Sequence, residues 1–279
     1  MRTLEDIFPY DNFRKYQRNL IDFIYSSFLD SRIGIVYAPT GLGKTISALS
    51  AHLLEPDDKL IVLTRTKNQS AIYASELNKI KERINDLSFV FIRSKQELCM
   101  ITHRSEKIRK IPYTVFLRIC EKLKREGKCR YYNRSISDGE FSDLLIRSAE
   151  RLLSAGATAT KILKISIKRG LCPYEVARYL VRLANIVVGT YSYIFNPRVR
   201  EIFLSSADIS LGDIRLLVDE AHNLPNFIEH QHVRILNIAT LELAKRKLRN
   251  YVDEASVRVD ELIDTIEHIH SEIQQRLAV

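Results

Sequence analysis

The sequence predicts an α/β fold built on a parallel β-sheet, with a basic, mainly helical segment set into it. Three observations predict this class. Short apolar runs are continuous rather than alternating, which is typical of strands buried on both faces of a parallel sheet. Helical patterns separate these runs, and a glycine-rich stretch follows the first of them. The 279 residues, 46% of them hydrophobic, are enough for two domains with packed cores.

Five runs are the predicted strands. They are "GIVYA" at 34–38, "LIVLT" at 60–64, "FVFI" at 89–92, "NIVVGT" at 185–190 and "IRLLVDEA" at 214–221. Apolar residues share one helical face before the first run (Leu20, Phe23, Ile24, Phe28) and before the third (Leu77, Ile80, Ile84). This alternation of helices and strands indicates a phosphate-binding α/β sheet.

The alternation stops between about residues 93 and 183, which we interpret as an insertion. The expected domains are therefore 1–92, the insertion 93–183, the continued sheet 184–228 and a helical segment 229–279. In the last segment, apolar residues recur at alternating steps of four and three, at Leu248, Val252, Ala255, Val259, Leu262, Ile266, Ile269 and Ile273. This seam predicts a long helix that packs within its own fold or against a second copy.

The charge of the chain is concentrated in the insertion. Of the net charge of +9, the segment from Arg93 to Arg182 holds 21 basic and nine acidic residues, a net of +12, which leaves 22 basic and 25 acidic residues elsewhere. Such a segment suits a polyanion such as nucleic acid, although a solvated helical surface has the same signature. No run resembles a secretion signal or a membrane span, so we expect an intracellular protein, cytoplasmic or, in a eukaryote, nuclear.

The stretch "APTGLGKT", Ala38 to Thr45, predicts bound phosphate. It departs from the pattern G-x-x-x-x-G-K-[ST] only in having Ala38 at the first position. The glycines let the backbone N–H groups face an anion, Lys44 can reach the β- and γ-phosphates of ATP, and Thr45 can ligate Mg²⁺. The candidate ATP-binding residues of this loop are Thr40, Gly41, Leu42, Gly43, Lys44 and Thr45. The alternative is an ordinary glycine-rich turn.

The stretch "LLVDEAHN" supplies the carboxylates that such a site needs. Asp219 and Glu220 follow an apolar run, so they are expected at the carboxyl edge of the sheet, where α/β active sites lie. Asp219 would act on Mg²⁺, Glu220 would orient the attacking water, and His222 would link the site to neighbouring motifs. A salt-bridged turn is the alternative.

These motifs together resemble a known family. "APTGLGKT", "LTRTKNQ" and "VDEAHN" resemble motifs I, Ia and II of superfamily 2 helicases, and "GLCPYEVAR" is similar to the XPD family of iron–sulfur DNA helicases, archaeal members above all. The order of motifs matches along essentially the whole chain. The resemblance implies a P-loop, RecA-like motor domain with a parallel sheet, an iron–sulfur insertion and the beginning of a helical arch domain. It also implies ATP-dependent 5′ to 3′ unwinding of DNA in excision repair.

The four cysteines all lie in the basic insertion. Cys99, Cys120, Cys129 and Cys172 are separated by 20, eight and 42 residues, without a C-x-x-C pair, so spacing alone leaves a metal site and buried structural thiols open. The resemblance implies that they ligate a [4Fe–4S] cluster. Zinc remains an alternative because four thiolates also suit a tetrahedral Zn²⁺ site.

The resemblance further implies nucleotide-base and DNA contacts. Arg14 and Gln17 in "FRKYQ" match the position where the family contacts adenine, with a surface helix start as the alternative. Thr64 and Arg65 match a motif Ia that touches the DNA backbone. Around the cysteines, cations and aromatic side chains are mixed, which suits single-stranded or forked DNA; the candidates there are Lys128, Arg130 and Tyr131.

A complete motor of this class needs a second motor domain, whose arginine stabilises the transferring phosphoryl group. No second set of strands is indicated after Asn223. We therefore expect the chain to bind DNA and nucleotide but to need another part, such as a second polypeptide, for full ATP hydrolysis. The alternatives are a non-motor protein that binds single strands through the insertion and has a vestigial phosphate loop, and a redox sensor.

Overall fold

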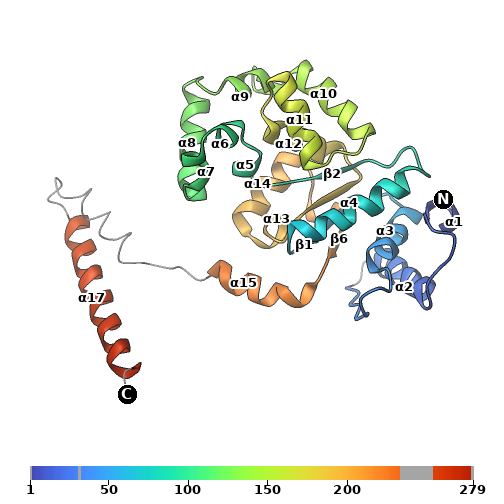
Figure 1. The fold of residues 1–279 in the computed structure, drawn as a ribbon, viewed down its shortest axis with the longest axis horizontal. Coiled ribbons are helices and arrows are strands. Elements are labelled where there is room, and N and C mark those ends of the chain that lie inside the picture. Colours follow the sequence, from blue (N-terminus) through green and yellow to red (C-terminus); the bar gives the residue numbers. More distant parts are fainter. Residues whose placement is uncertain (1, 31–32, 233–253, 278–279) are drawn as a thin grey trace. The chain divides into compact units, whose positions relative to one another are not determined.

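A computed structural model describes residues 2–30, 33–232 and 254–277 of the chain (Figure 1). Two compact units are present, residues 1–225 and 226–279. The first unit contains the sheet and the basic insertion, and the second contains the long helix α17 (Glu254–Leu277). The prediction of a long helix is therefore confirmed over these residues, whereas Leu248 and Val252 of the predicted seam lie outside the described part of the chain.

The sheet of the first unit has four parallel strands. They are β1 (Lys59–Thr64), β2 (Phe89–Phe91), β5 (Ile186–Thr190) and β6 (Ile214–Val218), in the spatial order β2-β5-β1-β6. Every pairing is parallel, as the continuous apolar runs predicted. The two central strands are almost wholly buried, whereas all five residues of β6 are only half-buried.

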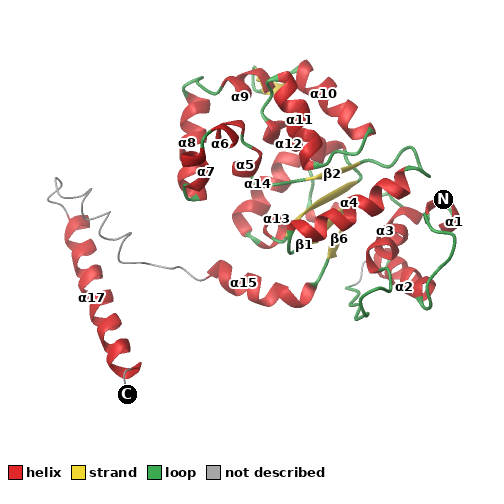
Figure 2. Ribbon diagram, viewed as in Figure 1, coloured by secondary structure: helices red, strands yellow, loops and turns green. Residues whose placement is uncertain are grey.

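Helices pack around this sheet (Figure 2). In the first unit, those outside the insertion are α1 (Leu4–Ile7), α2 (Gln17–Leu29), α3 (Lys44–Leu54), α4 (Lys67–Lys81), α13 (Ser192–Phe195) and α14 (Pro197–Ala207), with the 3₁₀ turns η1 (Leu211–Asp213) and η2 (Ala221–Asn223). Helix α15 (Leu224–His232) begins at the end of this unit and continues into the second. Helices α2, α3 and α4 share one apolar core with β1, β2 and β5. Its centre includes Leu49, Leu60, Leu77 and Phe89, each fully shielded from solvent. This core fixes the strand ends that carry the candidate site.

The insertion is mainly helical, as predicted. It contains α5 (Lys95–Leu98), α6 (Met100–Arg104), α7 (Glu106–Lys110), α8 (Tyr113–Arg125), α9 (Arg130–Ser135), α10 (Asp143–Ser154), α11 (Ala159–Arg169) and α12 (Pro173–Leu183), with a short hairpin of β3 (Ile136–Ser137) and β4 (Glu140–Phe141).

The insertion is hydrogen-bonded to strand β2 of the sheet, because Ala157 donates to Phe89 O (3.0 Å) and accepts from Phe91 N (2.9 Å). Gly156 has φ +74°, and a Cβ there would collide with the Phe89 ring, so the approach requires glycine.

The predicted first strand, 34–38, is wrong. This segment has no regular structure, and its side chains are exposed: Ile35 is 84% accessible and Tyr37 fully so. An apolar run becomes a strand only when a neighbouring strand supplies its hydrogen bonds. Among the described residues, β6 pairs with β1 alone and its outer edge has no neighbour. Within the described ranges, the sheet is therefore open beyond β6.

None of the helices that the structure describes is both long enough and apolar enough to cross a membrane.

Candidate nucleotide site and cysteine pocket

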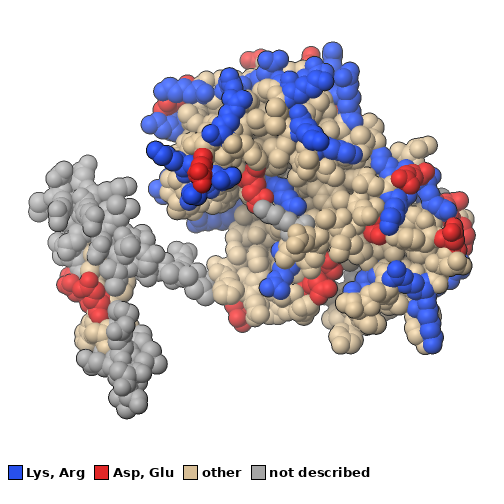
Figure 3. All heavy atoms as spheres, in the orientation of Figure 1, with Lys and Arg blue, Asp and Glu red and all other residues tan. Residues whose placement is uncertain are grey.

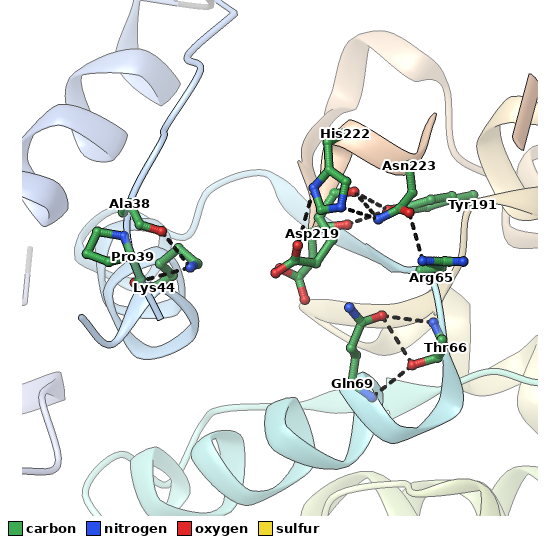
Figure 4. A network of polar contacts seen from close by, with 11 residues as sticks. Ala38, Pro39, Lys44, Arg65, Thr66, Gln69, Tyr191, Asp219, His222 and Asn223 are labelled. Carbon is green, nitrogen blue, oxygen red and sulfur yellow. Dashed lines mark hydrogen bonds and ion pairs between the residues drawn. The ribbon is translucent and has the colours of Figure 1, made fainter. Parts of the chain in front are cut away.

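The glycine-rich loop has the backbone that its sequence predicted. Gly41 and Gly43 have φ of +90° and +89°, values that L side chains rarely adopt, and Gly43 is the N-cap of α3. Lys44 Nζ donates to Ala38 O (2.8 Å) and Pro39 O (3.3 Å), so its ammonium lies over the loop (Figure 4). The loop and the first turn of α3 together form the positive end of an eleven-residue helix, which favours an anion.

Arg14 and Gln17 lie against this loop, although they are far from it in sequence. Gln17 is 2% exposed, and its Oε1 accepts from Arg14 N (2.9 Å). The Arg14 guanidinium donates to Gly41 O, and a Cβ on Gly43 would collide with Gln17. The structure therefore brings both predicted nucleotide-base residues to the phosphate loop. Gln17 is fixed by packing, whereas Arg14 is exposed at the rim.

Asp219 and Glu220 follow β6 at the carboxyl edge of the sheet, as predicted. Asp219 N continues the ladder by donating to Leu63 O (2.9 Å), and Tyr191 Oη donates to the backbone oxygens of Asp219 (2.5 Å) and Glu220 (2.9 Å). Glu220 has φ +53°, a left-handed conformation that is uncommon for a non-glycine residue and that recurs at functional sites. His222 Nδ1 pairs with Glu220 Oε2 (3.3 Å).

The two halves of the site are electrostatically coupled. Burial raises the pKa of the Asp219 carboxyl, the neighbouring Glu220 raises it further, and Lys44 lowers it. Figure 4 shows Lys44 and Asp219 on facing sides of the site. Tyr73 of α4 is 2% exposed and lies beside Thr45 and both carboxylates. Burial first, and then Asp219 and Glu220, raise the pKa of Tyr73 well above the ordinary value, whereas its hydrogen bond with Thr45 lowers it. Sequence analysis missed Tyr73 because it shares an apolar helical face with Leu77 and Ile80.

Motif Ia connects β1 to α4, and its two predicted DNA residues have different environments. Thr64 is fully buried, and its hydroxyl donates to Thr66 O (3.2 Å) and Gly189 O (3.3 Å). Its side chain therefore stabilises the carboxyl end of the sheet. Arg65 is exposed and donates to Asn223 Oδ1 (2.7 Å), which joins motif Ia to the segment after Asp219 (Figure 4). Of these two residues, only Arg65 has a side chain exposed enough to contact a DNA phosphate.

The four cysteines line one pocket in the insertion. Cys99, Cys129 and Cys172 are the N-caps of α6, α9 and α12, and Cys120 lies on α8. All four thiols are free. Cysteines separated by eight to 42 residues thus line the same pocket because four helix segments pack together. Among the described residues, no three His, Cys, Asp or Glu side chains are arranged to hold a single metal ion.

The pocket is apolar at its base and cationic at its wall. Met100, Cys129 and Tyr131 form a small buried cluster. Burial is the main cause that raises the pKa values of Cys99, Cys120 and Cys172, the last to about 12. Lys95 and Lys124 act in the opposite direction and lower the pKa of Cys120. Thiolates in this pocket therefore require positive charge, which a bound metal group or the two lysines can supply.

Basic side chains gather on the insertion (Figure 3). Lys128 and Arg130 are exposed, and Lys128 pairs with Glu126 at 2.7 Å. Tyr131 is only 8% exposed and its hydroxyl accepts a hydrogen bond from Arg130 (2.9 Å), so its ring is buried in this arrangement and its contact with DNA stays a prediction. Tyr131 is buried because it packs in an apolar cluster with Met100 and Cys129, and the sequence does not reveal this packing.

A phosphate loop at a helix N-terminus, facing an Asp–Glu pair at the carboxyl edge of a parallel sheet, defines a P-loop nucleotide-binding domain. The chain matches the DEAD_2 family over residues 62–241, and it belongs to that family. The predicted family relationship is thereby confirmed.

Named relatives agree with this assignment. The chain is 26% identical over 237 residues to the ATP-dependent DNA helicase XPD of Sulfolobus acidocaldarius, covering 85% of this chain and 37% of the relative. It is 27% identical over 272 residues to the general transcription and DNA repair factor IIH helicase subunit XPD of Arabidopsis thaliana, covering 90% of this chain and 35% of the relative. The chain thus spans little more than a third of the length of these relatives.

Solved structures confirm the fold. A structure of an XPD helicase superposes with a TM-score of 0.60 at 23% identity, covering 92% of this chain and 40% of the other. A truncated XPD gives a TM-score of 0.57 at 22% identity, covering 89% of this chain and 64% of the other. The predicted α/β class with a parallel sheet is therefore confirmed.

Proposed function

We propose that this chain is the N-terminal portion of an ATP-dependent DNA helicase of the XPD type, which moves 5′ to 3′ and serves DNA repair. The observation that carries the proposal is the phosphate loop facing Asp219 and Glu220. DNA as the substrate implies work in the cytoplasm, or in the nucleus of a eukaryote.

Each side chain of the nucleotide site has a proposed role. Lys44 binds the β- and γ-phosphates of ATP, and Thr45 and Asp219 hold Mg²⁺, which when bound neutralises charge on the phosphate oxygens. Glu220 orients the attacking water, and His222, whose Nδ1 lies 3.3 Å from Glu220 Oε2, restrains the Glu220 carboxylate. Arg14 at the rim of the loop and Gln17, which must turn out of its buried position, are the proposed contacts of the adenine ring.

The cysteine pocket suits a [4Fe–4S] cluster. The donor set is four thiols around one pocket, and thiolates are the ligands that such clusters use. A single tetrahedral Zn²⁺ draws its four sulfurs to within about 2.3 Å of one ion. Iron, sulfide and zinc analysis of the purified chain distinguishes the two groups: iron and sulfide in equal amounts support the cluster, and stoichiometric zinc contradicts it. Cys99, Cys120, Cys129 and Cys172 are its proposed ligands.

The exposed cations of the insertion and of motif Ia are the proposed DNA contacts. Arg65, Lys128 and Arg130 bind phosphates of single-stranded or forked DNA, a contact that does not depend on sequence. Because Arg65 also bonds Asn223, DNA at motif Ia communicates with the segment that follows Asp219 and Glu220.

The open side of the sheet supports a partner for this chain. Among the residues that the structure describes, the outer edge of β6 has no neighbouring strand and the apolar segment 34–38 is exposed, so an added strand would extend the sheet there. We propose that a second polypeptide carrying the second motor domain supplies this strand, together with the arginine needed for efficient ATP hydrolysis.

A nucleotide-binding measurement tests the core of this function. The purified chain should bind a fluorescent ATP analogue in the presence of Mg²⁺, and Lys44→Ala should weaken that binding by about 10- to 100-fold while leaving affinity for single-stranded DNA unchanged. Equal nucleotide affinity in the two proteins contradicts the assignment of the loop.

A further inference from the structure

Next to the cysteine pocket lies a buried carboxylate that the proposed function does not use. Glu175 of α12 is 1% exposed, and its Oε1 lies 3.5 Å from Lys124 Nζ while its Oε2 lies 3.1 Å from Arg178 Nε. A buried charge is costly unless it is paired. Arg178, three residues along the same helix, already pairs with Glu175. The contact with Lys124, which joins two different helices, therefore adds a second cation beyond the one needed for neutrality.

The ion pair joins the two helix turns that carry Cys120 and Cys172. Lys124 lies four residues after Cys120 on α8, and Glu175 lies three residues after Cys172 in the first turn of α12. Residues at these spacings share one helical face, and both Lys124 and Glu175 line the pocket together with the thiols. A bond between the two side chains therefore fixes the distance between the two cysteine-bearing turns.

The ammonium of Lys124 also contacts the element that carries a third cysteine. Its Nζ lies 3.9 Å from the centroid of the Tyr132 ring, and Tyr132 is three residues after Cys129 on α9. This cation–π contact and the bond to Glu175 hold the ammonium between α8, α9 and α12. The cation consequently lies at the wall of the pocket, where four thiolates would concentrate negative charge.

We propose that Glu175 is a positioning residue for the group in the cysteine pocket: it holds Lys124 at the pocket wall, which keeps the Cys120 and Cys172 turns together and places a cation beside the thiolates. This inference rests on the proposed function, in which the pocket holds an iron–sulfur group.

Retention of iron tests the proposal in the loaded chain. The full chain and the variants Glu175→Gln and Lys124→Met are purified without oxygen, and iron release to a ferrous chelator is followed by absorbance. Changes beside metal ligands weaken binding by about tenfold or more, so both variants should release iron about ten times faster. Lys122→Met is the matched control, because Lys122 is exposed on the same helix and pairs with Glu126 at 3.9 Å. Release from Glu175→Gln at the wild-type rate overturns the proposal.

A second variant covers the case in which Glu175→Gln does not fold. Replacing both partners, Lys124→Met with Glu175→Met, removes the ion pair between α8 and α12 without leaving either of its members buried and unpaired. Arg178 also loses its contact with Glu175, but its side chain is 29% exposed and water can solvate it. This double variant should melt at the wild-type temperature and still release iron about ten times faster. Wild-type iron retention by the folded double variant overturns the role of the cation.

Thiol labelling separates this inference from the proposed function. In the reduced, metal-free chain, Cys120 and Cys172 should react with a maleimide several times faster in Glu175→Gln than in the wild type, with Lys122→Met unchanged. Equal labelling rates overturn the positioning role, whether or not iron binds. Absence of iron and sulfide from the wild-type chain instead contradicts the proposed cluster, and labelling then remains the test of Glu175.

Discussion

The nucleotide site and the cysteine pocket differ in how completely this chain builds them. The nucleotide site combines the carboxyl edge of the sheet, where Asp219 lies, with a loop whose preceding segment 34–38 is outside the sheet. The cysteine pocket is enclosed by helices of one insertion, and its cationic wall is held by a buried carboxylate, Glu175. The same chain thus forms one site with all of its proposed ligands and another that lacks structural support on one side.

This difference has a consequence for function. A pocket formed by packed helices holds its ligands without help from a partner, whereas a phosphate loop needs its strand fixed in the sheet to keep the loop and the carboxylates in register. We therefore expect metal binding to be a property of this chain alone and efficient ATP hydrolysis to require the partner.

The largest effect is expected from Cys129→Ser. Cys129 is the buried thiol of the four and belongs to the cluster with Met100 and Tyr131. Its loss removes a ligand, so iron and sulfide should fall to background in elemental analysis of the purified chain. Nucleotide affinity should not change, because the phosphate loop lies outside the insertion. Loss of nucleotide binding in this variant would show that the two sites are not independent.

Lys44→Ala is the reciprocal change. A hydrogen bond to a charged group contributes about 1.5–3 kcal/mol, so affinity for Mg²⁺–ATP should fall by about 10- to 100-fold. Fluorescence titration measures this fall, and the iron content of the same preparation should equal that of the wild type. A variant that lost iron as well would contradict the separation of the two regions.

The buried His52 of α3 should make the stability of the first unit depend on pH. Its side chain is fully buried, neither ring nitrogen has a hydrogen-bond partner among the described residues, and its pKa is lowered to about 3, by burial first and by Arg215 second. The folded chain keeps His52 neutral, while the unfolded chain binds a proton below about pH 6.5. Stability is therefore fully present above that value and is lost as the pH falls towards 3.

At pH 5 this single group should lower the free energy of unfolding by about 2 kcal/mol relative to pH 7.5. Urea denaturation at the two values measures the difference, and His52→Leu should remove this part of it. His268→Ala, which changes an exposed histidine of α17, serves as the control. An acid sensitivity that is the same in His52→Leu and in the wild type would show that His52 is protonated in the folded chain.

The smallest effect is expected from Lys128→Ala in the insertion. Loss of one exposed phosphate contact should weaken single-stranded DNA binding a few-fold for every sequence and reduce the salt slope by about 0.7. Anisotropy titrations at several salt concentrations measure both quantities. Lys79→Ala, which removes the same charge from α4, should leave the slope unchanged; equal effects of the two changes would mean that the insertion has no special share in DNA binding.

The sequence predicted those parts of the structure that depend on local pattern. Continuous apolar runs located β1, β2, β5 and β6, and the loop at Gly41 and Gly43 has the expected left-handed backbone. The segment 34–38 has the same pattern and was predicted wrongly, because a pattern shows that residues are apolar and does not show whether a neighbouring strand exists.

The side-chain environments were less accessible to prediction. Thr64 and Tyr131 are polar or amphipathic residues in basic surroundings, yet tertiary packing buries both. The meeting of four thiols and the Glu175–Lys124 pair depend on how helices pack, which spacings of 20, eight and 42 residues do not reveal.

The rate of ATP hydrolysis by the iron-loaded 279-residue chain, with and without single-stranded DNA, tests the central claim most directly. The chain should contain iron and sulfide in equal amounts, bind Mg²⁺–ATP, and show no turnover that DNA stimulates. Robust DNA-stimulated hydrolysis by the same iron-loaded chain, absent from Glu220→Gln, would contradict the claim that its nucleotide site is incomplete without a partner.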